Sequence, residues 1–250
     1  MCLVWEFSEN IALTDSSGAS DRLLLALTAL ALVPIVLWDL SGLDLAMARL
    51  AGDAAGFALR DNRLLVLGLH EIPRFLGMLG VVALVAAVRW PLGVLRRLDA
   101  RARLQLALSV LAALAAVSLL KNTSRSSCPW DLAEFGGAAR YVSHWDWGLR
   151  DGGPGRCFPA GHASAAFAYL GGWFVLRRSM PRAAWVWLAM AACFGLVLGL
   201  AQQWRGAHYM SHTLWTAWVC WVVGWAVDVF FHHRRRPAPG PQATPKLNES

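Results

Sequence analysis

Charged side chains are scarce in this sequence. Asp, Glu, Lys and Arg make up 16% of its 250 residues, whereas 57% are hydrophobic and the mean hydropathy is +0.44. Typical soluble domains carry about 25% charged residues. The composition therefore excludes an ordinary soluble protein of one or two domains and indicates an integral membrane protein.

A basic region is missing ahead of the first apolar run. Glu6, Glu9, Asp15 and Asp21 precede that run instead. Because a cleavable signal peptide begins with a basic region, we expect the first apolar segment to remain in the chain as a membrane anchor. An internal repeat is not evident either.

The apolar residues form runs that suit a bilayer, whose hydrocarbon core takes roughly 20 mostly apolar residues to cross. The simplest count is six, which predicts an all-α, polytopic membrane helix bundle with a long outward loop between the third and fourth helices. The second run is short, so its helix must also include residues on the His70 side. The alternative of five membrane spans would place the two termini on opposite sides of the membrane. The predicted spans are 23–40, 73–88, 104–120, 162–176, 183–200 and 213–231.

Arginines cluster in three short segments, 89–103, 177–182 and 234–236. The positive-inside rule assigns such segments to the cytoplasm. Both termini then lie on the cytoplasmic side of the membrane, and the other connections face outward. The net charge of +7 is thereby explained by topology, without a nucleic-acid partner.

The chain divides into one membrane domain and a short tail. We expect residues 1–231 to form a single six-helix domain. Residues 232–250 are rich in Pro and polar residues and have no apolar period, which predicts a disordered cytoplasmic tail.

Two of the five cysteines, Cys128 and Cys157, share the predicted outward loop. Outside the cytoplasm, thiols meet oxidising conditions. A bond between them would close a loop of about thirty residues and stabilise the fold by roughly 3–4 kcal/mol in the chain-entropy model. We predict a Cys128–Cys157 disulfide, with two free thiols as the alternative.

Three polar stretches are predicted to meet at the outward end of the bundle. They are KNTSRSSCPW, RCFPAGHASAAF and QQWRGAHYMSHTLW, beginning at residues 121, 156 and 202. Charge beside a membrane interior is costly and usually functional. These stretches are therefore where we look for the chemistry.

The stretches contain the parts of an anion site. Ala160 and Gly161 form a turn into a helix, whose first backbone N–H groups are available to an anion. Lys121, Arg125 and Arg205 add positive charge that suits phosphate oxygens.

Two histidines complete the set. His208 and His162 have ordinary pKa values near neutrality, so they offer a nucleophile and a general acid. His212 follows His208 by one helical turn.

The same residues resemble the lipid phosphate phosphatases, the type 2 phosphatidic acid phosphatase superfamily. Its motifs are K-x-x-x-x-x-x-R-P, P-S-G-H and S-R-x-x-x-x-x-H-x-x-x-D. Here they resemble Lys121 to Pro129, the PAGH at 159–162, and Ala201 to His212. The resemblance covers about residues 104–230 and implies a bundle of six membrane helices.

The resemblance also implies a reaction. His208 would attack phosphorus to form a phosphohistidine, His162 would protonate the leaving oxygen, and Lys121 with the motif arginines would bind the phosphoryl oxygens. The implied substrate is a membrane lipid phosphate or diphosphate at the outer face, and no metal or cofactor is needed. Phosphoryl transfer depends chiefly on positioning and charge stabilisation, which a cationic pocket supplies.

Each motif departs from the family pattern. Cys128 and Gln202 stand at the two arginine positions, and Ala160 stands at the serine position. We expect Arg125 and Arg205, each three residues from a missing arginine, to take over its role, because three residues are nearly one helical turn.

His212 stands where the family has an aspartate. A neutral His212 would accept a hydrogen bond from His208 and so fix its tautomer, but it cannot supply negative charge. The outer loop offers four candidate carboxylates, which are Asp131, Glu134, Asp146 and Asp151.

Other functions stay open at this point. One is a phosphotransferase acting on the same lipids, and another is a catalytically inactive, lipid-binding relative, which the departures favour. A third is a metal or haem protein with His208 and His212 as ligands. The charge of Arg205 disfavours a cation there, and haem would need mid-span histidines that the sequence lacks. No feature of the sequence sets an oligomeric state.

Overall fold

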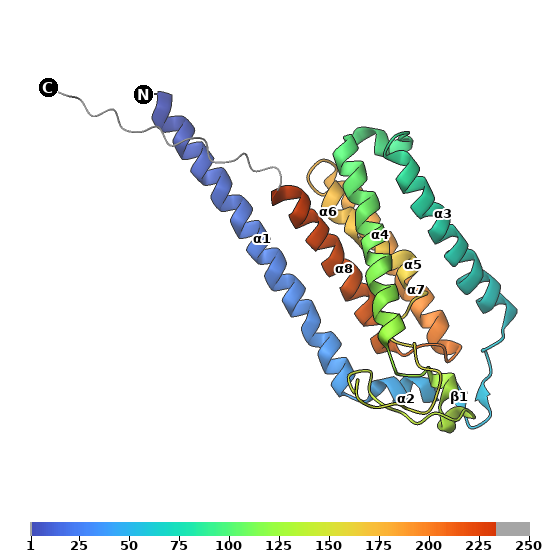
Figure 1. Ribbon diagram of the computed structural model, residues 1–250. Coiled ribbons are helices and arrows are strands. Elements are labelled where there is room, and N and C mark those ends of the chain that lie inside the picture. Colours follow the sequence, from blue (N-terminus) through green and yellow to red (C-terminus); the bar gives the residue numbers. More distant parts are fainter. Residues whose placement is uncertain (1, 234–250) are drawn as a thin grey trace.

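Helical passes run alternately up and down through the computed structural model, which describes residues 2–233 (Figure 1). This arrangement confirms the predicted polytopic helical bundle. The predicted tail lies outside the described residues, except that α8 continues through His233. In chain order the passes are α1 (Cys2–Leu40); a π-helix (Leu64–Glu71) that continues as α3 (Ile72–Ala87); α4 (Ala100–Thr123); α5 (Ser164–Phe167), a 3-10 turn (Ala168–Gly171) and α6 (Gly172–Leu176); α7 (Pro181–Trp204); and α8 (Met210–His233).

The passes differ in length. Within the described residues, 5 helices are long and apolar enough to cross a membrane. The second reaches this length by recruiting residues on the His70 side, as predicted. The fourth pass, Ser164–Leu176, is shorter and made of three helical pieces. The long helices are Asp21–Leu40, Leu64–Ala87, Ala100–Thr123, Pro181–Trp204 and Met210–His232.

Short elements gather at the lower end of the bundle in Figure 1. They are α2 (Leu43–Arg49), an antiparallel pair of β1 (Gly52–Asp53) and β2 (Gly56–Phe57), and 3-10 turns at Pro129–Asp131 and Ala133–Phe135. The pair has Gly52 opposite Phe57 and Asp53 opposite Gly56. At the upper end, a 3-10 turn (Gly93–Arg97) joins α3 to α4.

Local sequence signals set several helix boundaries. The carboxylate of Asp99 accepts a hydrogen bond of 2.6 Å from the N–H of Ala102 and so caps α4. Pro181 occupies the first turn of α7, where its missing N–H has no cost.

The fourth pass packs closely against α8 because two glycines face one another. A Cβ added to Gly224 would lie 2.6 Å from the Cα of Gly171, closer than any side chain allows. Small residues of this kind let helix backbones approach each other in membrane proteins. The contact holds the short fourth pass in the centre of the bundle.

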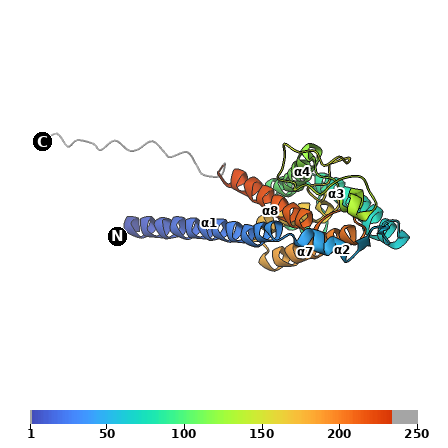
Figure 2. The same ribbon diagram turned by 90° about the horizontal axis from the view of Figure 1, so that it is seen from below.

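The first helix lies beside α8, as Figures 1 and 2 both show. The indole N–H groups of Trp218 and Trp221 donate to the backbone oxygen and the hydroxyl of Thr28, at 3.3 Å and 3.0 Å. Because these donors are satisfied within the protein, α1 is tied to the bundle by specific polar contacts.

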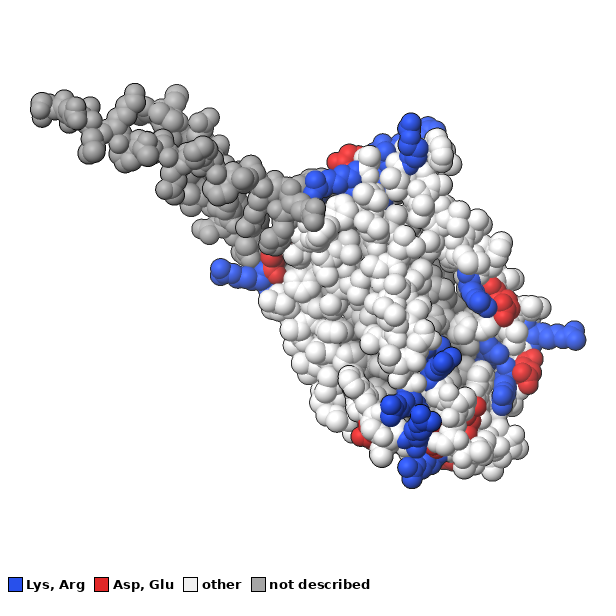
Figure 3. Space-filling view, in the orientation of Figure 1, with Lys and Arg blue, Asp and Glu red and all other residues white. Residues whose placement is uncertain are grey.

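Charge is concentrated at the two ends of the molecule. In the space-filling view, Lys and Arg dominate the upper end and both signs of charge appear at the lower end, while the flank between them is largely uncharged (Figure 3). This pattern suits a bilayer around the flank.

Asp228 forms a buried polar centre near the upper end of α8. It is 2% exposed and lies 3.1 Å from Arg177 and 3.3 Å from Arg178, and it accepts a hydrogen bond from Gln105 at 2.8 Å. We expect Asp228→Ala to lower the free energy of unfolding by about 3 kcal/mol, because it leaves the half-buried guanidinium of Arg177 and the buried amide of Gln105 without their carboxylate. Thermal unfolding in detergent measures this.

The control for that prediction is Arg178→Ala. The Arg178 side chain is 45% exposed, so its ion pair is screened and worth little. Equal midpoints for Asp228→Ala and Arg178→Ala would contradict the structural role of Asp228.

Candidate phosphoryl-transfer site

The three polar stretches converge at the lower end of the bundle in Figure 1. Lys121 lies in the last turn of α4, His162 shortly precedes α5, and His208 lies between α7 and α8. A Cβ at Gly161 would be 3.4 Å from Cδ of Lys121. The Lys121 side chain therefore passes over the PAGH turn, and the glycine keeps that approach open.

The rings of His162 and His208 lie near each other, with centroids 6.3 Å apart. Burial lowers the pKa of His208 well below its ordinary value, and Lys121 lowers it further. Burial, His70 and Lys121 lower the pKa of His162 from 6.5 to about 3. Both rings are thus neutral at neutral pH, which leaves His208 able to act as a nucleophile.

A general acid needs a proton, and a bound phosphate changes the balance for His162. Its negative charge offsets the cations that depress the pKa of this ring, so protonation becomes easier when substrate is present. The arrangement thus favours proton uptake by His162 with the substrate bound over uptake by the empty site.

The depressed pKa of His162 predicts how stability depends on pH. In the unfolded chain the imidazole takes up a proton near pH 6.5, whereas in the folded protein it does so only near pH 3. Between these values the unfolded state binds more protons, so stability falls as pH decreases. We expect His162→Gln to show a shallower loss of thermal stability from pH 6.5 to pH 4 than wild type; parallel curves would contradict the assignment.

Arg205 lies beside Gln202, which holds the family's arginine position. Its Nη1 donates to Oε1 of Gln202 at 3.0 Å, and its Nε donates to the backbone oxygen of Arg60 at 2.9 Å. Arg205 keeps α-helical dihedral angles at the end of α7 and so lies one turn from Gln202, as the spacing predicts; that it takes over the anion-binding role stays a prediction. Burial lowers the pKa of Arg205, and the remaining N–H groups of its guanidinium are available to an anion.

The structure places Arg125 differently from the prediction. Helix α4 ends at Thr123, and both Ser124 and Cys128 have extended dihedral angles. Arg125 is exposed and lines a cavity of about 380 Å³ with Val142 and Trp147. It is not brought against the histidines, because no helical turn connects it to position 128.

The Ala160 backbone is also placed differently from the prediction. Its N–H donates to the backbone oxygen of His212 at 3.2 Å, and its carbonyl accepts from the Thr216 hydroxyl at 3.2 Å. This N–H is thus engaged in fastening the PAGH turn to α8. Gly161, beside Lys121, remains the member of the turn that faces the site.

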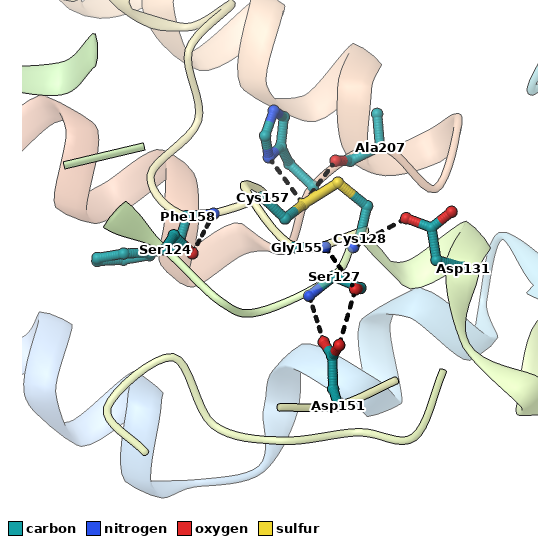
Figure 4. Close-up of a disulfide and its surroundings, with 10 residues drawn as sticks. Ser124, Ser127, Cys128, Asp131, Asp151, Gly155, Cys157, Phe158 and Ala207 are labelled. Atoms are coloured by element: carbon teal, nitrogen blue, oxygen red, sulfur yellow. Dashed lines mark hydrogen bonds between the residues drawn. A yellow bond between two sulfur atoms is a disulfide. The ribbon is translucent and has the colours of Figure 1, made fainter. Parts of the chain in front are cut away.

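The predicted disulfide is present. Cys128 and Cys157 are joined with an S–S distance of 2.07 Å (Figure 4). Asp151 braces the loop around it, since its carboxylate accepts from the N–H and the hydroxyl of Ser127 at 2.5 Å and 3.0 Å. The bridge thus links the first polar stretch to the second.

His212 is fully buried, and its ring centroid lies 5.8 Å from that of His208. Nδ1 of His212 has no hydrogen-bond partner, whereas Nδ1 of His208 lies 3.5 Å from Sγ of Cys157. The predicted hydrogen bond between the two rings is therefore replaced by a contact between His208 and the disulfide.

The four carboxylates proposed for His208 have other partners or positions. Asp131 accepts from the N–H of Cys128 at 3.2 Å, and Glu134 pairs with Arg49 at 2.5 Å. Asp151 braces Ser127, and Asp146 is exposed. They organise the outer loop and its surface.

A carboxylate that sequence reasoning missed lies behind His212. Asp39, at the end of α1, is 3.3 Å from Nε2 of His144 and accepts from the indoles of Trp145 and Trp215 at 3.0 Å and 2.7 Å. His144 in turn lies edge-on to His212, with centroids 5.4 Å apart. A polar cluster on α1 and the outer loop thus backs the start of α8.

His70 is a second missed residue. Its ring lies 3.9 Å from that of His162 between centroids, and its Nδ1 is 2.9 Å from the Glu71 carboxylate. The π-helix that brings it there gives no sequence signal that separates it from an ordinary helical turn.

Cys128, Cys157 and His208 form the group of described residues whose ligand atoms lie close enough for a metal, within 4.8 Å. Metal ligation by cysteine uses the thiolate, and here both sulfurs are joined to each other. The donor set therefore does not fit a metal while the disulfide is intact.

Comparison with known proteins agrees with this geometry. A search of curated proteins and a search of solved structures gave no significant match. The family model described as the PAP2 superfamily matches residues 102–236, which is more than half of the 250 residues and includes all three polar stretches. Members of this superfamily are generally phosphatases, and the chain belongs to the PAP2 superfamily.

Proposed function

We propose that this protein removes a phosphate group from a membrane lipid phosphate or diphosphate through a phosphohistidine on His208. The observation that carries the proposal is the meeting of two neutral histidines, His208 and His162, with Lys121 and Arg205 at one end of a membrane bundle. Cations bind the phosphoryl oxygens, and the histidines supply nucleophile and proton.

In this reaction Nε2 of His208 forms a bond to phosphorus as the bond between phosphorus and the leaving oxygen breaks. His162 gives a proton to that oxygen, and water then attacks the phosphohistidine, with His162 taking its proton. Inorganic phosphate leaves, His208 is neutral again, and His162 again carries the proton that it took up when the substrate bound.

An apolar groove supports a lipid as the substrate. It has a volume of about 560 Å³ between α3, α5 and α7, and it begins at Leu69 and Ala165, near the two histidines His70 and His162. Phe194 and Met190 line it with side chains that are 58% and 55% exposed. A hydrocarbon chain lying there would place its phosphate at the site.

The proposed orientation has the site on the outer face. Arg177 and Arg178 and the arginine-rich segment 93–97 lie at the opposite end of the bundle, and such segments stay in the cytoplasm. A disulfide next to the site also suits an oxidising compartment. In bacteria this corresponds to the periplasmic face of the inner membrane, with both termini inside.

The direct test is phosphate release from a panel of lipid phosphates and diphosphates by purified protein, with His208→Ala as the blank. Adding a second lipid as acceptor separates hydrolysis from phosphotransfer. Release from any lipid by wild type alone supports the proposal, and equal release by both proteins contradicts it.

The groove gives a prediction of its own. We expect Met190→Trp to lower kcat/KM for a long-chain lipid phosphate by roughly 10-fold, because the indole fills space needed by the chain. A short-chain substrate should be affected less. The matched control is Met78→Trp, which places the same side chain on a lipid-exposed position of α3 outside the groove; equal losses in both variants would contradict the assignment.

A further inference from the structure

The Cys128–Cys157 disulfide lies directly against the proposed nucleophile. Sγ of Cys157 is 3.5 Å from Nδ1 of His208 and 3.2 Å from the backbone oxygen of Ala207. Cys157 and His208 are 0% and 2% exposed. The sulfur therefore contacts a buried ring from which water is nearly excluded.

Cys157 is held firmly in this position. Its N–H donates to the backbone oxygen of Ser126 at 3.0 Å, while the N–H of Cys128 donates to Asp131 at 3.2 Å. Figure 4 shows Asp131 beside the bridge and Asp151 below Ser127. Both ends of the disulfide are thus anchored by backbone hydrogen bonds, and the sulfur is a fixed part of the wall.

The contact determines which nitrogen of His208 can react. A neutral imidazole carries one N–H and one lone pair, and sulfur is a weak acceptor. An N–H at Nδ1 that points to sulfur leaves the lone pair on Nε2, directed away from the disulfide. The opposite tautomer would carry its lone pair on Nδ1, against the disulfide, where a phosphoryl group has no room.

We propose that Cys157, within its disulfide, is a positioning residue that orients His208 and fixes its reactive tautomer. This inference rests on the proposed function of His208 as nucleophile. The disulfide, and not His212, orients His208 in this proposal. Nδ1 of His212 has no hydrogen-bond partner, and the His212 ring does not bond to His208.

The test compares the variants Cys128→Ser, Cys128→Ser/Cys157→Ala and Cys128→Ser/Cys157→Asp with wild type. Activity is measured as kcat, KM and the pH profile of kcat on short-chain phosphatidic acid in detergent micelles, with circular dichroism to confirm folding. Cys193→Ser, at an exposed free cysteine, is the control for cysteine substitution.

We expect Cys128→Ser/Cys157→Ala to lower kcat by roughly 10- to 100-fold, which is less than the roughly 10⁴-fold cost of a wrong tautomer in a Ser-His-Asp triad. KM should stay within about twofold, because ground-state binding is untouched. Cys128→Ser keeps a sulfur beside the ring and should lose less. The aspartate variant should recover activity and shift the acidic limb of the profile to higher pH, since a carboxylate stabilises the protonated ring.

Several outcomes overturn the inference. One is wild-type kcat in the alanine variant, and another is an equal loss with unchanged pH profiles in all three variants, which would show that the bridge acts only through loop folding. If the alanine variant fails to fold, the pH profiles of Cys128→Ser and Cys128→Ser/Cys157→Asp are compared instead. The same shift of the acidic limb in the aspartate variant then supports the inference, and unchanged profiles overturn it. Wild type without phosphatase activity on every lipid of the panel contradicts the proposed function and this role with it. An active wild type isolates the role of Cys157, and if another lipid of the panel is the better substrate, the variants are compared on a short-chain form of that lipid.

Discussion

Replacing His208 with alanine should lower kcat for phosphate release by roughly 10³-fold or more, because the variant has no atom on which the phosphoenzyme can form. The ring is buried beside Lys121 and the disulfide, so water is poorly placed to replace it. Wild type that is quenched during turnover with labelled substrate should carry a phosphoryl group that is labile in acid and stable in base. It should carry no acid-stable phosphate ester.

The comparison uses two further variants. His208→Gln keeps polarity and approximate volume but not the nucleophile, so it should be as inactive as alanine. His232→Gln changes a histidine at the opposite end of the bundle, near Asp228, and should retain activity. A His208→Ala protein with wild-type turnover would exclude the phosphohistidine mechanism, and inactive wild type on every lipid would favour an inactive relative.

Arg205→Ala should lower kcat by roughly 10²- to 10³-fold. A loss of this size is typical when a preorganised hydrogen-bond donor to a charged transition state is removed. Arg205 is only 7% exposed, and two of its nitrogens already bond to Gln202 and Arg60. The group is thus fixed before substrate arrives. Arg205→Lys should recover little, because one ammonium cannot keep both bonds and bind the anion.

Two comparisons separate this role from the alternatives. Gln202→Ala removes one support of the guanidinium but not its charge, so its loss should be smaller, about 10-fold. Arg125→Ala removes an exposed arginine and should change kcat by no more than about twofold. A greater loss in Gln202→Ala than in Arg205→Ala would assign the anion to position 202, and a large loss in Arg125→Ala would restore that residue to the site.

The helices and their order were accessible from sequence because hydrophobic length is a strong local pattern. The same pattern placed Lys121, His162 and His208 at one end, which the structure bears out. The prediction for Arg205 used the helical spacing from Gln202 and agrees with their hydrogen bond. The position of Arg125 was predicted from the same spacing to Cys128. That prediction is wrong because the chain is no longer helical after Thr123.

The residues that surround His208 and His162 could not be predicted from the sequence. They are brought there by contacts between distant parts of the chain, many of them in an irregular loop. Pairing of Cys128 with Cys157 was predicted, but its contact with His208 depends on how the loop packs on the segment after α7. Asp39 reaches His144 across 105 residues of chain, and no periodicity encodes that pairing. His70 reaches His162 only through a π-helix.

The short fourth pass bears on the depth of the proposed reaction in the bilayer. Helical residues from Ser164 to Leu176 rise by about 20 Å, whereas a bilayer's hydrocarbon core is about 30 Å thick. Arg177 and Arg178 follow the pass at once. In the proposed orientation, with these arginines at the inner boundary, His162 therefore lies several ångströms short of the outer boundary. A lipid substrate would then have to bring its phosphate below the plane of the neighbouring head groups, so we expect lipids with small head groups to be better substrates than lipids that carry bulky sugars.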